Sequence, residues 1–209
     1  MTLLTSLNSF FHFNSAAFLL AAGYIGLFAG VFAETGFLIG LFLPGGETLI
    51  FTAAVLASIG YFNIWIVALL SFLAAVFADS LEYGFGRRYG PRVFTKDGSR
   101  WLDRSYIDRS KEFFDRHGPK TIIISRFLPF IRTLAPAFAG VGKMSYPRFA
   151  LYNVAGAAIW VAVASGTGYW LGMIFPNAEQ YIAGFVIVVA IVSMFTSWLM
   201  VHRHRTKIR

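Results

Sequence analysis

Five ionisable side chains lie within apolar stretches of this sequence, and their types suggest anion binding and charge exchange. They are Glu34, Glu47, Asp79, Arg126 and Arg132. An ionisable group inside a membrane costs about 2.5–3.5 kcal/mol on insertion scales, so such residues are functional candidates by default. We therefore take these five as the candidate site, with no catalytic residue and no metal ligand among them.

Two of the five are arginines with a proline midway between them. Arg126 and Arg132 are six residues apart, and Pro129 lies at the centre of that interval. On an unbroken helix this spacing corresponds to about 600° and would point the two side chains apart. A proline predicts a break in the helix, and a break lets both guanidinium groups converge. Two permanently charged, forked donors suit a phosphate group, so the pair predicts a phosphate-binding site.

The acidic candidates suggest proton or ion coupling. Burial disfavours the charged form of a carboxylate and a neighbouring arginine favours it, so Glu34 and Glu47 could respond to protons. The alternative is that they only pair with the arginines to neutralise the interior. Asp79 lies three residues before Glu82, which places the two side chains near one another on a helix. Asp79 could line a pathway, or both residues could be ordinary interface residues.

The composition is that of an integral membrane protein. Of the 209 residues, 57% are hydrophobic and 13% are charged, whereas a soluble domain has about 25% charged residues. The sequence contains no cysteine, which excludes disulfides and thiolate chemistry, and no cofactor is expected. We predict one all-α polytopic membrane domain over residues 1–209.

The basic residues are unevenly distributed. Residues 1–86 contain no lysine or arginine, residues 87–120 contain ten, and the last seven residues contain four. Such clusters mark cytoplasmic segments, so the basic tail at 202–209 is expected in the cytoplasm. Nucleic-acid-binding proteins also carry basic clusters, but these clusters flank hydrophobic spans. Membrane topology and anionic lipid headgroups explain them with fewer assumptions, and no nucleic-acid partner is expected.

The first half of the chain is predicted to contain a broken hairpin followed by a span. Residues 16–59 are interpreted as an N-terminal helix and a first re-entrant hairpin that turns at Pro44, Gly45 and Gly46. Residues 16–33 could cross the membrane or join this hairpin. Non-helical backbone at membrane depth requires cover from protein or a water-filled cavity. Residues 61–87 are predicted to span the membrane.

The second half is predicted to repeat that arrangement. Residues 99–117 are interpreted as an amphipathic helix on the cytoplasmic headgroups, with a solvated linker helix as the alternative. Residues 120–142 are predicted to form a second re-entrant hairpin, broken at Pro129 and Pro136. Residues 147–175 and 181–201 are predicted to be transmembrane spans.

A short phrase occurs once in each half. FLPGGETL at 42–49 and FLPFIRTL at 127–134 are identical at five of eight positions, and YGFG at 83–86 is followed by YWLG at 169–172. The charge distribution predicts that the two halves have opposite orientations. The sequence therefore predicts an inverted-topology repeat, in which paired broken helices hold the substrate near the bilayer midplane, as in secondary transporters.

Three segments resemble the DedA family of bacterial inner-membrane proteins, also called the VTT or SNARE-associated Golgi protein family. They are FAETGFLIGLFLPGGETL, ADSLEYGFGRRYG and FFDRHGPKTIIISRFLPFIRTLAPAFAGVGKMSYPRFALYNVAGAAIW. The resemblance implies two re-entrant hairpins and a role in recycling undecaprenyl phosphate across the cytoplasmic membrane, linked to envelope integrity, cell division and the proton-motive force. Related eukaryotic proteins are lipid scramblases.

The same resemblance implies roles for particular residues. The family's essential arginines correspond to Arg126 and Arg132, and its essential acidic pair corresponds to Glu34 and the acid after Pro-Gly. Many members have Pro-Gly-Asp or Pro-Gly-Glu, whereas this chain has the extra residue Gly46 before Glu47. This difference affects where Glu47 is placed.

We therefore expect a flippase for undecaprenyl phosphate or a related lipid phosphate, coupled to protons or cations and embedded among membrane lipids. The alternative is a proton-coupled small-ion antiporter. A lipid phosphatase is disfavoured because no Ser-Gly-His signature is present, and a structural scaffold leaves the costly buried charges unexplained. A homo-oligomer is compatible with each of these functions.

Overall fold

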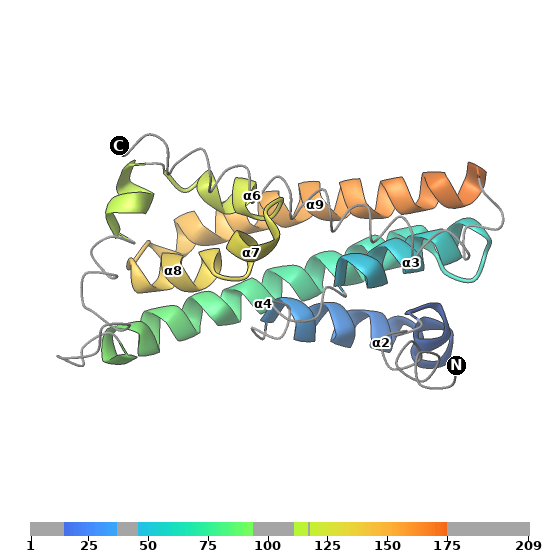
Figure 1. The fold of residues 1–209 in the computed structure, drawn as a ribbon, viewed down its shortest axis with the longest axis horizontal. Helices are drawn as coiled ribbons and strands as arrows, with labels where there is room; N and C mark the ends of the chain where they lie inside the picture. The colour runs from blue at the N-terminus through green and yellow to red at the C-terminus, as the bar shows by residue number, and fades with distance from the viewer. Residues whose placement is uncertain (1–14, 37–45, 94–110, 117, 175–209) are drawn as a thin grey trace, which may run out of the picture.

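The computed structural model describes residues 15–36, 46–93, 111–116 and 118–174, and within these ranges every regular element is a helix (Figure 1). Three helices are long and apolar enough to cross a membrane: α2 (Ser15–Gly36), α4 (Ile64–Val93) and α9 (Tyr146–Ile174). The chain is therefore a multi-pass membrane protein. A shorter apolar helix, α3 (Gly46–Ser58), lies between α2 and α4 in the sequence.

The helix bounds differ in places from the predicted spans. Helix α4 continues through Arg87 and Arg88 to Val93, past the predicted end at residue 87. Both arginines are exposed, so their charged heads can reach water while the backbone remains helical. Of the predicted amphipathic helix at 99–117, only residues 111–116 are described, and these are helical. The predicted turn residues Pro44 and Gly45, the span at 181–201 and the tail at 202–209 lie outside the described residues.

The segment around the arginines is broken into three short helices. They are α6 (Thr121–Ser125), α7 (Pro129–Arg132) and α8 (Ala135–Val141). Leu128, directly before the first proline, has extended backbone angles (φ −117°, ψ 106°), as expected for a residue that precedes proline. Both Pro129 and Pro136 lie in the first turn of a short helix, where the missing N–H costs no helical hydrogen bond. The predicted break thus lies at Leu128. That the segment enters and leaves the membrane on one side stays a prediction.

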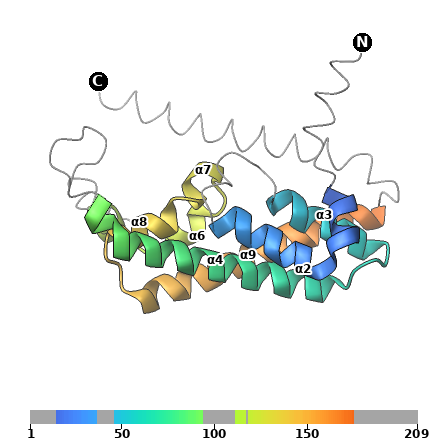
Figure 2. The same cartoon turned by 90° about the horizontal axis from the view of Figure 1, so that it is seen from below.

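The short helices pack against the long ones. Helices α2 and α3 lie beside the N-terminal half of α4, and α8 lies beside its C-terminal half (Figures 1 and 2). Helix α3 also packs along α9, and α6 contacts α9 nearer its start. A core of apolar side chains from α2, α3, α4 and α9 fills the space between these helices. The layout places the end of α6 and all of α7 over the middle of the long helices.

Glycines set the distance between the packed helices. A Cβ added at Gly86 of α4 would overlap the carbonyl oxygen of Ala137 in α8. A Cβ at Gly168 of α9 would lie 2.8 Å from the carbonyl oxygen of Phe51 in α3. Small residues let helix backbones approach closely inside membranes. Gly168 and Gly172 of α9 both allow a close approach to α3, whereas a Cβ at Gly166 would meet nothing within 4 Å.

Substituting Gly86 by alanine is expected to destabilise the protein, because the new methyl group meets rigid backbone of α8. Overpacking of this kind typically costs about 1–3 kcal/mol. The matched control is Gly84→Ala, two residues earlier on the same helix, where a Cβ meets nothing within 4 Å. Thermal unfolding in detergent should show a lower Tm for Gly86→Ala and an unchanged or higher Tm for Gly84→Ala. Equal Tm values for the two variants would contradict the close approach of α4 and α8.

Candidate functional site

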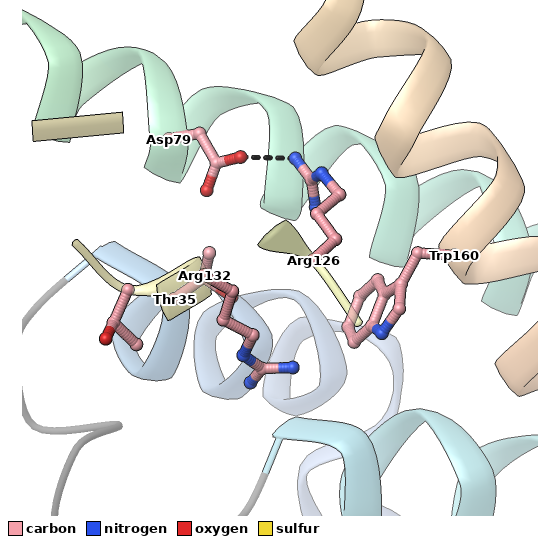
Figure 3. Close-up of a pocket in the computed structure, with 6 residues that line it drawn as sticks. Thr35, Asp79, Arg126, Arg132 and Trp160 are labelled. Carbon is pink, nitrogen blue, oxygen red and sulfur yellow. Dashed lines mark hydrogen bonds and ion pairs between the residues drawn. The ribbon is translucent and has the colours of Figure 1, made fainter. Parts of the chain in front are cut away.

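Arg126 joins three helices through its side chain. It follows the last residue of α6, and its side chain is buried. Its Nη2 donates hydrogen bonds to Asp79 Oδ2 on α4 and to Asn153 Oδ1 on α9, as the ion pair with Asp79 in Figure 3 illustrates. Asn153 Nδ2 in turn donates to the carbonyl oxygen of Val76 at 3.2 Å. This network fixes the end of α6 between α4 and α9.

Asn153 was not among the residues predicted from the sequence. It is fully buried and is the only amide side chain of α9. A polar side chain in the middle of an apolar span is costly and seldom without a function. The argument that selected the five charged residues would therefore have found Asn153 as well, had it been extended to uncharged polar side chains.

A glycine makes room for the Arg126 side chain. A Cβ at Gly156 of α9 would lie 3.1 Å from Arg126 Cδ and 3.2 Å from Arg126 Nε. The Nε atom itself is buried and has no hydrogen-bond partner among the described residues. Gly156 thus allows close packing of the Arg126 side chain and of the backbone of Ile123.

Arg132 lies at the end of α7 between an acid and an aromatic ring. Its Nη2 lies 3.4 Å from Glu34 Oε1 of α2. Its Cζ lies 5.3 Å from the centroid of the Trp160 ring on α9, within the range of a cation–π interaction. Trp160 is a wall of the site beside Arg132 (Figure 3).

The two arginines reach one pocket from opposite sides of the proline break. The pocket combines two guanidinium groups with the hydroxyls of two threonines, and one acid and one indole ring complete it. Its lining residues are Thr35, Asp79, Arg126, Arg132, Thr133 and Trp160. Such a set of donors can hold an oxyanion, and the two carboxylates paired with the arginines occupy the same donors from within the protein.

The acidic candidates are placed differently from one another. Asp79 is buried against Arg126, so it is not an ordinary interface residue. Glu34 pairs with Arg132, as the alternative of internal neutralisation proposed, but Arg126 is paired with Asp79 and not with a glutamate. Gly46 and Glu47 are the first two residues of α3. The Glu47 side chain lies outside the described part of the chain, so its role stays a prediction.

Removing one member of the Arg126–Asp79 pair is expected to be more damaging than removing both. A single substitution leaves an uncompensated buried charge and typically costs about 3–5 kcal/mol, whereas replacing the whole pair can be nearly neutral. We expect Arg126→Gln alone to lower Tm strongly and Asp79→Asn with Arg126→Gln to recover part of the loss. Thermal unfolding of the four proteins of this cycle measures the coupling. Strictly additive losses would show that the pair makes no net interaction.

Several known membrane proteins are similar to this chain in sequence. The family model described as "VTT domain" matches residues 43–170, a range that contains both arginines, Asp79, Asn153 and Trp160. Protein DedA of Escherichia coli K12 is 38% identical over 184 residues, which cover 87% of this chain and 83% of that protein. An uncharacterized membrane protein of Mycobacterium leprae is also 38% identical, over 86% of this chain and 80% of its own length.

Inner membrane protein YghB of Escherichia coli K12 is 34% identical over 170 residues, which cover 80% of this chain and 77% of that protein. No solved structure is significantly similar to the chain. Because the domain match extends over more than half of the residues and all three of these relatives are more than a third identical along most of their length, this chain belongs to the DedA family of VTT-domain membrane proteins.

Proposed function

We propose that this protein is a lipid-phosphate transporter of the bacterial cytoplasmic membrane that moves undecaprenyl phosphate, or a related lipid phosphate, between leaflets. The observation that carries the proposal is the pocket in which Arg126 and Arg132 meet across the Pro129 break. Recycling of an envelope-precursor carrier, as the family resemblance implies, would need such a headgroup site. Because of its charge, we expect the basic tail at 202–209 to lie in the cytoplasm.

Exchange of one anion for another keeps the pocket's charge balance. In the described structure Asp79 and Glu34 accept hydrogen bonds from the two arginines. A phosphate monoester offers three acceptor oxygens and can take over these donors. The guanidinium groups then stay paired throughout, which avoids the large cost of leaving a buried charge alone. The hydroxyls of Thr35 and Thr133 in the pocket wall supply further donors.

The surroundings of Arg132 favour a lipidic ligand over a free anion. Phe127, Ile131 and Leu134 are exposed apolar residues of the same broken segment, and two of them flank Arg132 and Thr133 in the sequence. In a bilayer this surface faces hydrocarbon chains, so an isoprenoid tail could remain in the lipid while its headgroup enters the pocket. A soluble phosphate would gain nothing from that surface.

Movement of the headgroup is proposed to follow from an inverted repeat. The short helix of each half packs on the long helix of the other half: α3 on α9, and α8 on α4. Gly86 packs on Ala137, and Gly172, its counterpart at an offset of 86, packs on Ser58 and Val55. Such reciprocal contacts support two related halves. Alternating exposure of paired broken helices around one central site is the transport mode of such folds.

A proton-coupled small-ion antiporter is the second candidate. It is favoured by three buried acids, Glu34, Asp79 and Glu82, in the same region. Proteoliposomes distinguish the two functions: the antiporter predicts a pH change inside the vesicle driven by an ion gradient without any lipid phosphate. Lipid-phosphate transport predicts no such change when the lipid is absent.

The test of the proposed function is a leaflet-exchange assay with labelled prenyl phosphate in proteoliposomes. We expect Arg126→Ala with Arg132→Ala to slow exchange by at least about tenfold, since hydrogen bonds to charged groups contribute about 1.5–3 kcal/mol each. Arg132→Lys keeps the charge without the fork and should give an intermediate rate. Arg148→Ala, which removes an exposed arginine at the start of α9, is the control and should exchange at the wild-type rate. Wild-type exchange by the double variant would overturn the proposal.

A further inference from the structure

Glu82 is a buried acid that the site described above does not use. It lies on α4, one helical turn after Asp79, and only 6% of its surface is exposed. Its Oε2 atom is buried and has no hydrogen-bond partner among the described residues. It does not line the pocket, and its ionisable neighbours are Asp79, Arg132 and Arg126. A carboxylate in this position is costly while it carries a charge.

Among the described residues, Glu82 has no ion-pair partner. On its own helix, Asp79 is another anion, and Arg87 is turned to the hydroxyl of Tyr83 and the carbonyl oxygen of Met144. From the broken segment, Arg126 is paired with Asp79, and Arg132 with Glu34 of α2.

The other helices packed on α4 do not change this balance. Helix α8 carries no titratable side chain. Helix α9 contributes the neutral Asn153 to the network, and its only arginine, Arg148, is exposed. The acid of α3, Glu47, has its side chain outside the described residues. Among the described residues, three acids are therefore buried: Glu34, Asp79 and Glu82. The two arginines of the pocket are both already engaged in ion pairs.

Resting on the proposed function, we propose that Glu82 is the proton-binding carboxylate of this site and that it holds a proton while a lipid phosphate occupies the arginines. A phosphate on Arg126 displaces Asp79 and adds negative charge one turn from Glu82. A proton taken up from water by Glu82 offsets part of that charge. Because coupling between two ligands is reciprocal, the proton strengthens phosphate binding as much as the phosphate strengthens proton binding.

The position of Glu82 along α4 suits this role. At 1.5 Å per residue, it lies about 4.5 Å along the helix axis from Asp79 and about 7.5 Å from Arg87. Arg87 and Arg88 are exposed and mark the end of α4 that reaches the aqueous side. Glu82 is thus between the pocket and water. This assigns the proton to a residue of α4, in addition to the acids that the family resemblance emphasises.

The first measurement is calorimetric binding of farnesyl phosphate to the purified full chain in detergent between pH 6 and pH 10. Binding linked to uptake of one proton weakens by up to about tenfold per pH unit as pH rises. We expect Glu82→Gln, which mimics the protonated acid, to bind well at pH 6 and to lose this part of the pH dependence. The ligand's own titration is common to both proteins and cancels in the comparison. Glu112→Gln, at an exposed acid, should follow the wild type.

The second measurement is Tm against pH without ligand, which tests the proton site independently of the lipid. Losing the proton from Glu82 leaves an unpaired buried charge in the folded protein, so wild-type Tm should fall as pH rises, and Glu82→Gln should flatten this slope. If farnesyl phosphate fails to bind but the Tm slopes differ, the proposed function fails and the proton site stands. Identical pH profiles of wild type and Glu82→Gln in both measurements overturn the assignment of Glu82. A Glu82→Gln chain that cannot fold contradicts it as well, since a neutral side chain of this shape is what the proposal requires.

Discussion

The buried guanidinium of Arg126 is the constraint on which the rest of the site depends. A buried cation has to be paired and hydrogen-bonded, and the partners come from two long helices: Asp79 from α4 and Asn153 from α9. Satisfying one side chain therefore holds α4, α9 and the end of α6 in a single arrangement. Gly156 is part of the same solution, because a Cβ at this position would lie only 3.1 Å from Cδ in the stem of the arginine.

The proline break brings a second arginine to Arg126 and so forms the candidate binding site. A continuous helix would carry Arg132 away from Arg126, and the extended Leu128 redirects the chain so that α7 presents Arg132 to the same pocket. The short helices on either side are covered by α4 and α9, which suits irregular backbone at membrane depth. The close approach of α8 to α4, at Gly86 and Gly140, keeps that cover tight.

Internal ion pairs explain how a membrane protein can keep this charged site in an apolar interior. In the described structure each arginine has an internal acid, so no cation is left alone. In the proposed function, a transported anion competes with groups that are already in place, so the free energy of exchange is small compared with that of burying a new charge. The acids that the anion displaces carry negative charge, and in our proposal a proton offsets part of it. The proposals thus connect headgroup binding, ion pairing and proton coupling through one set of residues.

Much of this protein follows from the sequence alone, and the remainder depends on which distant segments meet. Hydrophobic runs predict the helices, the proline after Leu128 predicts the break, and isolated charges in apolar segments identify Glu34, Asp79, Arg126 and Arg132, because these are local properties of the chain. The choice of Asp79 as the partner of Arg126, and the recruitment of Asn153 and Trp160 from α9, were decided by the tertiary structure. Periodicity indicates which face of a helix is apolar, but the crossing of helices far apart in the sequence determines which polar groups come within hydrogen-bonding distance.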